Sequence, residues 1–298
     1  MQRKVERHYD PADWDRISYH LKQNGYILLG EHYCPSPDTF KKRIASWGVR
    51  AIFYSFDRLS TDKIGDFFFQ PEEYSDSKKI PIHQEFSYTL EAPRYLFFYC
   101  RSPAQIGGET TILDGVRLLD EFPKNILNDF LTKGFTYHRN MPYRGGLGET
   151  WPVHFESNNR PEIEAYLSKK NIQFQWNEDD SLSTSRTQKA TRFHPDLQKE
   201  VWFAQPLLWH VSALGEQGNF FTQRFPSSQF PSHVTYGTGE EIPAEHLEKL
   251  RLWKQENAMY LQWNPRDLLV IDNWRVAHGR ETFAGPREHW IAMGSPSK

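Results

Sequence analysis

Short runs of bulky, strand-favouring residues constrain the fold of this chain most. Residues 95–100 read Tyr-Leu-Phe-Phe-Tyr-Cys, residues 110–113 read Thr-Thr-Ile-Leu, and residues 268–271 read Leu-Leu-Val-Ile. β-Branched and aromatic residues fit a pleated, buried surface, and the turn signals Pro103 and Gly107 lie between the first two runs. The pattern predicts a core of buried β-strands.

Helices are expected around these strands. Cap and stop signals predict them over residues 10–25, 36–48, 123–134 and 161–172, and from residue 243 onward. The irregular residues 141–160, which lie between core elements, are typical of a lid. Residues 50–80 include three consecutive phenylalanines and predict a loop region pinned by aromatic packing.

Composition narrows the class of protein. A chain of 298 residues fits one large domain, and we expect residues 1–298 to form it. The net charge of −2, spread along the sequence, removes the electrostatic argument for nucleic acid or an anionic membrane as partner. Cys34 and Cys100 fit neither a zinc spacing nor a disulfide framework. Without a signal peptide or a run of membrane-spanning length, the sequence predicts a cytoplasmic protein that acts on a small molecule.

A histidine and a glutamate stand two residues apart at His83 and Glu85. Side chains alternate along a strand, so an extended stretch would turn both toward one side. His-x-Asp/Glu occurs five times in the chain, so the pair alone is weak evidence. With a second histidine, however, it would complete the two-histidine, one-carboxylate set that suits non-haem Fe(II) oxygenases.

His278 is the candidate for the second histidine, because it follows the strand predicted at residues 268–271. Residues 272–280 read Asp-Asn-Trp-Arg-Val-Ala-His-Gly-Arg. This stretch, preceded by Trp263 and Asp267, resembles the C-terminal metal-ligand motif of the taurine dioxygenase (TauD/TfdA) family of Fe(II)/2-oxoglutarate-dependent dioxygenases. Gly-Gly-Glu-Thr at residues 107–110 matches a further motif of that family, and the similarity spans roughly residues 25–290.

Two more stretches resemble one branch of the family. Trp-Phe-Ala-Gln at residues 202–205 and Tyr-Gly-Thr-Gly at residues 236–239 are similar to the clavaminate synthase-like branch, which includes amino-acid hydroxylases of nonribosomal peptide biosynthesis. The resemblance implies a mainly β fold, a double-stranded β-helix (jelly-roll) with flanking helices.

The same resemblance implies a set of site residues. His83, Glu85 and His278 would hold Fe(II), and 2-oxoglutarate and O2 would be the co-substrates. Arg287 and Thr110 would bind the distal carboxylate of 2-oxoglutarate. An arginine suits this task because its planar fork matches a carboxylate.

Glu85 bears on the reaction. Halogenating relatives carry a small residue at this position, so the carboxylate favours oxygen transfer. The implied reaction is hydroxylation of an unactivated C–H bond in an amino acid or amino-acid-derived metabolite of secondary metabolism, with succinate and CO2 as co-products. Desaturation, cyclisation and epoxidation on the same iron site remain alternatives. A ligand-binding jelly-roll without turnover is disfavoured because every ligand is present, and a zinc hydrolase because Arg287 and Thr110 would then have no task.

Several polar residues are candidates for holding the carboxylate or amine of such a substrate. They are Arg144, Gln205, His210, Arg275 and Arg280. Ile291 stands where many family members carry a basic residue, so an anionic substrate group would need another partner. The sequence leaves open whether the small-molecule substrate is free or tethered to a carrier protein, and it leaves the oligomeric state open.

Overall fold

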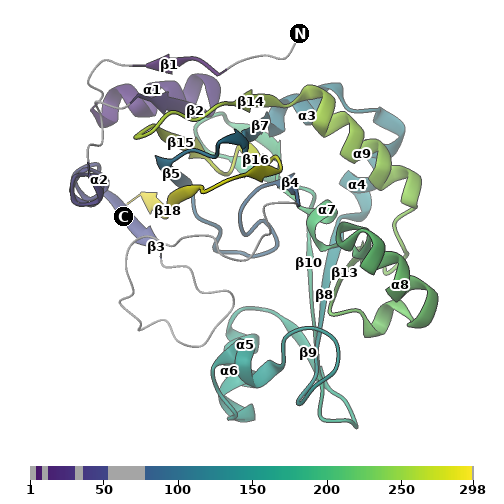
Figure 1. Ribbon diagram of the computed structural model, residues 1–298. Helices are drawn as coiled ribbons and strands as arrows, with labels where there is room; N and C mark the ends of the chain where they lie inside the picture. Colours follow the sequence, from purple (N-terminus) through teal and green to yellow (C-terminus); the bar gives the residue numbers. More distant parts are fainter. Residues whose placement is uncertain (1–4, 9–12, 31–35, 53–77, 297–298) are drawn as a thin grey trace.

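The computed structural model describes residues 5–8, 13–30, 36–52 and 78–296. Its largest sheet has six strands and forms the upper body of the molecule (Figure 1). The strands, in spatial order, are β1 (Arg7–His8), β2 (Tyr26–Leu29), β15 (Leu268–Asp272), β5 (Tyr95–Ser102), β18 (Glu288–Pro296) and β3 (Val49–Ile52).

A four-stranded sheet packs against the inner face of the first. Its strands, in spatial order, are β14 (Met259–Leu261), β7 (Thr110–Asp114), β16 (Val276–Arg280) and β4 (Ile80–His83). One hydrophobic cluster contains side chains from both sheets, among them Phe98 of β5 and Ile112 of β7. The site described below lies between these two sheets.

Alternation along β5 explains its fully apolar sequence. Leu96 and Phe98 belong to the cluster shared by the two sheets, whereas Phe97 and Tyr99 belong to a second cluster on the outer face. A strand that is buried on both faces reads as a continuous apolar run. The predicted strands at residues 95–100, 110–113 and 268–271 are thereby confirmed.

Helices α1 (Trp14–Asn24) and α2 (Pro37–Ser46) cover the outer face of the six-stranded sheet (Figure 1). Asp13 caps α1 by accepting a hydrogen bond from the Arg16 amide at 3.0 Å. The prediction that this helix begins near Asp10 and Pro11 is therefore wrong by a few residues, and those two residues lie outside the described ranges. Ser36 caps α2 as predicted, and Gly25 ends α1 with a φ of 80°.

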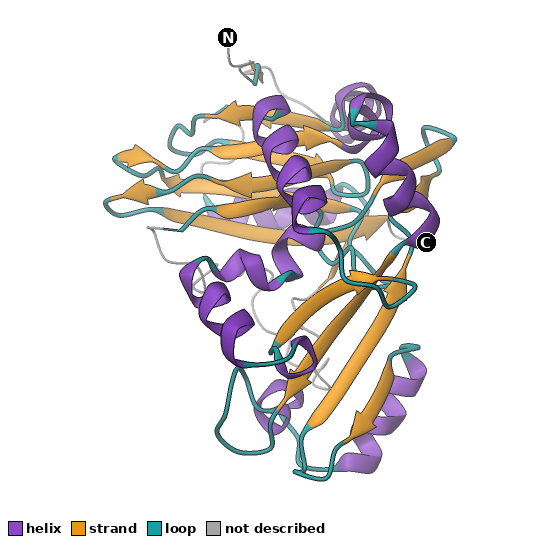
Figure 2. Ribbon diagram, turned by 90° about the vertical axis from the view of Figure 1, so that its right-hand side faces the viewer, coloured by secondary structure: helices purple, strands orange, loops and turns teal. Residues whose placement is uncertain are grey.

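A third sheet extends away from the body as a separate lobe (Figures 1 and 2). Its strands are β13 (Ser232–Tyr236), β8 (Phe135–Met141), β10 (Leu182–Gln188) and β9 (Gln173–Trp176). Two short helices lie at its far end, α5 (Trp151–Phe155) and α6 (Arg160–Lys169). The predicted irregular segment at residues 141–160 thus contains α5, and the sequence patterns did not predict β8, β9 or β10.

The remaining elements connect these layers. Short pairings join β11 (Thr191–His194) to β12 (Lys199–Trp202) and β6 (Ile106–Gly107) to β17 (Phe283–Ala284). The other helices are α3 (Gly115–Glu121), α4 (Lys124–Lys133), α7 (Pro206–Trp209), α8 (Glu216–Arg224) and α9 (Ala244–Asn257), with 3₁₀ turns η1 (Val211–Leu214) and η2 (Ser227–Gln229). Of the loop predicted at residues 50–80, residues 53–77 lie outside the described part. No helix within the described residues is long and apolar enough to cross a membrane.

Candidate metal centre and adjoining cavity

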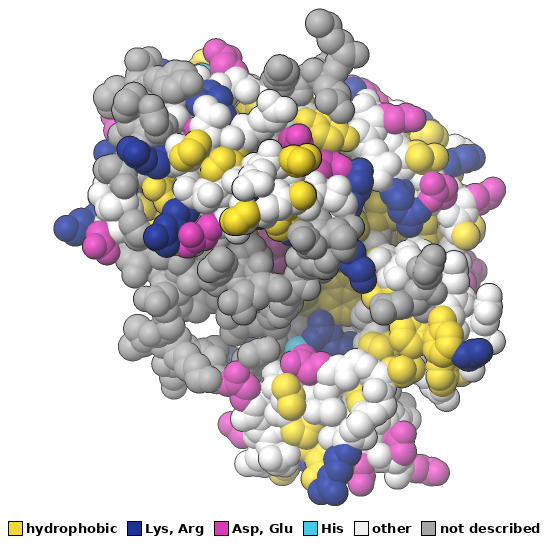
Figure 3. Space-filling model, in the orientation of Figure 1, with side chains coloured by type: hydrophobic (Ala, Val, Ile, Leu, Met, Phe, Trp, Pro, Cys, Tyr) yellow, Lys and Arg dark blue, Asp and Glu magenta, His cyan; other side chains and the backbone are white. Residues whose placement is uncertain are grey.

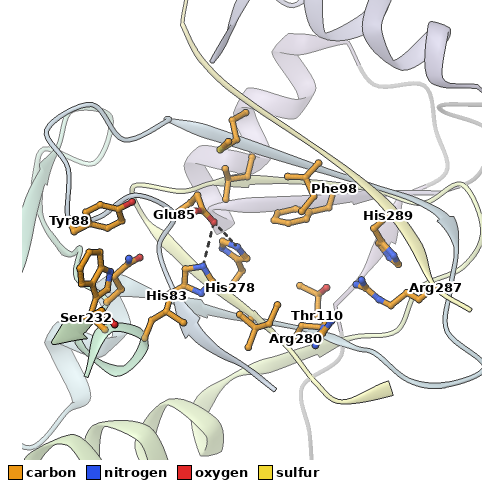
Figure 4. Close-up of a pocket in the computed structure, with 18 of the residues that line it drawn as sticks. His83, Glu85, Tyr88, Phe98, Thr110, Ser232, His278, Arg280, Arg287 and His289 are labelled. Atoms are coloured by element: carbon orange, nitrogen blue, oxygen red, sulfur yellow. Dashed lines mark ion pairs between the residues drawn. The ribbon is translucent and has the colours of Figure 1, made fainter. Parts of the chain in front are cut away.

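Three side chains that can bind a metal converge between the two packed sheets. His83 is the last residue of β4, Glu85 follows it, and His278 lies on the neighbouring strand β16. Glu85 Oε2 lies 3.4 Å from His83 Nε2 and 3.9 Å from His278 Nε2 (Figure 4). One ligating atom from each residue lies within 4.8 Å of the other two, close enough to share one ion.

Local contacts orient one of the two imidazoles, and burial acts on the charge of the other. His83 Nδ1 donates a hydrogen bond to the Pro81 carbonyl at 2.8 Å, which leaves Nε2 facing Glu85. Such a contact fixes the ring orientation and the tautomer of a ligating histidine. Burial, together with the adjacent His83, lowers the pKa of His278 well below its usual value, so His278 is neutral. The donor set of two imidazole nitrogens and one carboxylate fits Fe(II).

Glu85 reaches this position by a different route from the one predicted. The strand β4 ends at His83, and Glu85 lies in a turn that continues into Phe86 at a φ of 55°. Asn273 holds the turn in place, because its Oδ1 accepts from the Glu85 amide at 2.7 Å and its Nδ2 donates to the Glu85 carbonyl at 2.9 Å. The predicted convergence of His83 and Glu85 is observed, but an asparagine clamp produces it rather than strand alternation.

Gly279 allows the two histidine strands to approach each other. A Cβ added at this position would lie 2.7 Å from the Ile80 carbonyl oxygen and 2.8 Å from Thr111 Oγ1. The register between β16 and β4 also shifts between His278 and Arg280. The glycine after His278 is therefore required by close backbone contact.

A buried charge network anchors the segment that precedes His278. Arg94 Nε donates to Asp272 Oδ1 at 2.8 Å, and His194 Nε2 lies 2.9 Å from Asp272 Oδ2. The side chains of all three residues are at most 5 % exposed. Asp272, the acidic residue that opens the 272–280 motif, therefore stabilises the fold through these contacts and is not one of the three candidate metal ligands.

A cavity of about 270 Å³ adjoins the three ligating side chains. The space-filling view shows a hollow between the body and the lobe of the third sheet (Figure 3). In the close-up, Glu85 and the two histidines stand between two groups of lining residues (Figure 4). One end carries Thr110, Arg280, Arg287 and His289, and the other includes Tyr88 and Ser232.

Arg287 has no acidic partner among the described residues. It takes part in none of the ion pairs formed among the described residues, and its Nε is buried without a hydrogen bond there. Burial, with the charge of Arg280 nearby, lowers its pKa to about 10. Thr110 Oγ1 accepts from Trp263 Nε1 at 3.0 Å, so its own proton is available to a ligand. A carboxylate placed at this end would satisfy both residues.

His289 lines the same end and was not singled out from the sequence. Both of its ring nitrogens are buried without a hydrogen-bond partner in the described structure. Burial, reinforced by the Arg287 charge, lowers its pKa well below the usual value. Strand alternation could have identified it. In a strand, His289 points to the same side as Arg287, and every second residue from Arg287 to Met293 does line the cavity.

The candidate substrate residues divide into two groups. Gln205 and Arg280 line the cavity, whereas Arg144, His210 and Arg275 do not. Arg275 instead donates to Asp114 Oδ2 at 2.6 Å and to the Lys22 carbonyl at 2.8 Å. His210 follows α7 and its ring lies beside that of His233, and the Arg144 guanidinium stacks on Tyr143.

The two residues that do line the cavity have structural partners as well. With its amide oriented to satisfy both neighbours, the Gln205 nitrogen donates to the Gln84 carbonyl and its oxygen accepts from Trp209 Nε1. Gln205 therefore supports the backbone between His83 and Glu85. Arg280 donates to the Lys78 carbonyl at 2.6 Å and lies at the Arg287 end.

Arg139 and Ser232 also line the cavity, and the sequence patterns missed both. They are directly paired across β8 and β13, so their side chains share one face of the third sheet. The Arg139 guanidinium stacks over Trp209 at 5.1 Å, and its Nη1 lies 3.2 Å from each ring nitrogen of His154. Its Nε and Nη2 make no hydrogen bond to the described part of the chain, and they remain available to a ligand.

Sequence comparisons match nearly the full length of the chain. The family described as "Taurine catabolism dioxygenase TauD, TfdA family" matches residues 4–293. The chain is 30 % identical over 277 residues to the dapdiamide synthesis protein DdaC of Enterobacter agglomerans, covering 93 % of this chain and 84 % of that protein. It is 24 % identical over 293 residues to a clavaminate synthase-like protein of Arabidopsis thaliana, covering 95 % and 83 %.

Solved structures share the fold at low sequence identity. PvcB, described as an Fe, alpha-ketoglutarate dependent oxygenase from an isonitrile synthetic pathway, superposes with a TM-score of 0.54 at 14 % identity, covering 95 % of this chain and 80 % of its own. An asparagine oxygenase in complex with Fe(II), 3-hydroxyasparagine and succinate gives a TM-score of 0.56 at 10 % identity, covering 95 % and 79 %.

Proposed function

The chain belongs to the taurine catabolism dioxygenase (TauD/TfdA) family, and from that premise we propose that it hydroxylates a carbon of an amino acid or amino-acid-derived metabolite in a biosynthetic pathway. Membership of the family makes it an Fe(II)/2-oxoglutarate-dependent dioxygenase. The observation that carries the proposal is the arrangement of the cavity. The candidate metal-binding triad lies between Arg287 at one end and Arg139 at the other, and neither arginine forms an ion pair with a described carboxylate.

We assign the metal to His83, Glu85 and His278. Their ligating atoms lie within 4.8 Å, and their two imidazoles and one carboxylate leave further coordination positions for the co-substrates. Bound Fe(II), with 2-oxoglutarate and O2, supplies the oxidising chemistry that attacks a C–H bond and yields succinate and CO2. Asn273 and the Pro81 carbonyl keep two of the ligands aimed inward.

We assign the distal carboxylate of 2-oxoglutarate to Arg287, with Thr110 as a second contact. The buried guanidinium is costly without a counter-charge, and the keto acid provides one. His289, neutral and beside Arg287, offers one more hydrogen-bonding group at this end. Arg280, a candidate substrate residue, stands at the co-substrate end and adds positive charge there.

We assign the carboxylate of the substrate to the opposite end of the cavity. Arg139 and Ser232 present donors side by side. Because this chain has Ile291 where many family members carry a basic residue, an anionic substrate group needs another cation, and Arg139 can supply it. Trp209 and Tyr88, which line this end, would flank the aliphatic part of the substrate. Gln205 would contribute indirectly, by accepting a hydrogen bond from Trp209 Nε1 and so holding that side chain in position. The name of the relative DdaC, a dapdiamide synthesis protein, supports a biosynthetic role.

Two further assignments rest on family membership. The facing six- and four-stranded sheets correspond to a double-stranded β-helix of the clavaminate synthase-like type, and residues 1–298 correspond to a single catalytic domain. A free amino acid and one tethered to a carrier protein both remain candidate substrates. Desaturation, cyclisation or epoxidation would use the same residues.

Turnover with a substrate panel tests this function. Iron-loaded protein is incubated with 2-oxoglutarate, O2 and single amino acids, supplied free and as pantetheine thioesters, and succinate and product mass are measured. We expect at least one compound to stimulate succinate release and to gain one oxygen atom. Loss of two hydrogens would indicate desaturation instead. Stimulation by none of the panel would refute an amino-acid substrate.

A further inference from the structure

Arg139, the cation assigned to the substrate carboxylate, contacts two rings. Its guanidinium lies over Trp209 at 5.1 Å from the ring centroid, and its Nη1 lies 3.2 Å from both ring nitrogens of His154. A point at this equal distance lies over the face of the imidazole, because within the ring plane it would collide with a ring carbon. His154 thus contacts one guanidinium nitrogen and leaves the other two to the cavity.

Glu149 fixes the imidazole that Arg139 contacts. His154 Nδ1 lies 2.9 Å from Glu149 Oε2. Because an ionised carboxylate can only accept, Nδ1 carries a proton and donates it to this hydrogen bond. A neutral imidazole has one such proton, so a single tautomer satisfies Glu149 and presents an uncharged ring to the guanidinium. The contact with Glu149 therefore sets both the tautomer and the orientation of His154.

The fold defines the position of Glu149. On one side, Gly148 has a φ of 80°, and a Cβ added there would lie 2.7 Å from the Pro231 Cβ. On the other side, Trp151 begins α5, and its buried Nε1 donates to the Asp180 carbonyl at 3.0 Å. Glu149 is therefore held between two fixed points, although its side chain is 41 % exposed.

A small second cavity explains why Arg139 needs this support. The cavity has a volume of about 30 Å³, and Arg139, His154 and Trp209 all line it. Arg139 and Trp209 also line the main cavity, so the arginine borders both spaces. A guanidinium released from His154 would have room to turn into the small cavity and away from the substrate.

We propose that Glu149 and His154 are positioning residues for substrate binding. Glu149 orients the His154 ring, the ring holds Arg139 Nη1, and Arg139 Nε and Nη2 are thereby kept for the substrate carboxylate. The inference rests on the proposed function, because it takes Arg139 as the group that binds the substrate. It gives residues 141–160, which contribute no side chain to the lining of the main cavity, a part in substrate binding.

The test is made at Glu149, because replacing the buried His154 would also remove packing from the lobe. Iron-loaded full-length variants are assayed with 2-oxoglutarate and O2. The probe is the compound of the amino-acid panel that most stimulates succinate release by wild type. We expect Glu149→Ala to raise the KM for this compound by about threefold to tenfold, the range that one hydrogen bond accounts for. Glu178→Ala, which changes an exposed glutamate between β9 and β10, should keep the wild-type KM.

A double-mutant cycle separates positioning from a general effect on the lobe. In an Arg139→Gln background, Glu149→Ala should leave the KM unchanged, because the group that it positions is already gone. Glu149→Gln, whose amide oxygen can still accept from the imidazole, should keep a KM near that of wild type. The proposal is overturned by a normal KM in Glu149→Ala, by an equal rise with and without Arg139, or by a KM in Glu149→Gln as high as in Glu149→Ala.

Chemical modification of Arg139 separates this inference from the proposed function. If no panel compound stimulates succinate release, an amino-acid substrate is refuted, but the position of Arg139 can still be measured. Phenylglyoxal reacts with arginine side chains, and mass spectrometry of the peptide that contains Arg139 follows its modification. We expect faster modification in Glu149→Ala than in wild type and Glu178→Ala. A rate in Glu149→Ala no higher than in the other two proteins would overturn the proposal.

Discussion

His83 and His278 stand directly opposite each other on the antiparallel strands β4 and β16, with ring centroids 4.6 Å apart. The pairing brings together two residues that lie far apart in the sequence, and the turn after β4 brings Glu85 into reach. Strand register therefore sets the ligand geometry, and changes that disturb this register should weaken metal binding before they unfold the protein.

Asn273→Ala removes the clamp on the Glu85 backbone. We expect the affinity for Fe(II) to fall by about 10- to 100-fold, the range seen when groups supporting a ligand are lost. Anaerobic titration of Fe(II) measures it. Asn140→Ala, which removes an amide bonded to the Phe230 carbonyl in the third sheet, is the control and should keep its affinity. Equal affinities in the two variants would contradict the clamp.

Gly279→Ala forces a methyl group against the Ile80 carbonyl and Thr111. Overpacking of this kind costs about 1–3 kcal/mol, and here it separates β16 from β4. We expect a lower free energy of unfolding in urea together with weaker metal binding. Unchanged stability would show that the strands do not need the glycine.

Arg287→Gln removes the cation assigned to the distal carboxylate. We expect the KM for 2-oxoglutarate to rise by at least about tenfold, since a hydrogen bond to a charged group contributes roughly 1.5–3 kcal/mol, while Fe(II) affinity stays the same. Arg101→Gln, an exposed arginine paired with Glu288, is the matched control. A normal KM in Arg287→Gln would refute the assignment.

Arg139→Gln removes the donor assigned to the substrate carboxylate. We expect the KM for the amino-acid substrate to rise by at least about tenfold for the same physical reason, with the KM for 2-oxoglutarate unchanged. Arg144→Gln, outside the cavity, should behave as wild type. If Arg144→Gln were the impaired variant, the substrate carboxylate would bind instead at residues 141–160, the segment predicted to be a lid.

Lys254 is buried, and its Nζ donates to the Ile82 carbonyl beside His83. Burial lowers its pKa to about 7. Between about pH 7 and its ordinary pKa of roughly 10.4, the unfolded chain binds a proton that the folded chain does not, so stability rises with pH.

Lys254→Met should remove that dependence. The free energy of unfolding of wild type, minus that of the variant, should increase by up to about 1.4 kcal/mol per pH unit above pH 7 and stay level below it. Urea unfolding of both proteins across this range measures the difference. A difference independent of pH would show that Lys254 titrates normally.

The body of the fold could be predicted because its strands are buried on both faces. The apolar run at β5 follows directly from that burial, and the motif around His278 identified the strand that carries the second candidate metal ligand. The third sheet could not be predicted, since β8 carries His138, Arg139 and Asn140 in sequence and lacks an apolar pattern. The pairing of Arg139 with Ser232 depends on the register between β8 and β13, which local spacing does not encode.

Anaerobic addition of Fe(II) and 2-oxoglutarate to metal-free protein tests the central claim most directly. The measurement is the visible charge-transfer absorption of the iron-bound keto acid. Wild type and His246→Ala, whose imidazole is hydrogen-bonded to Tyr236, should develop the band, and His278→Ala should not. A missing band in wild type, or a full band in His278→Ala, would contradict the account.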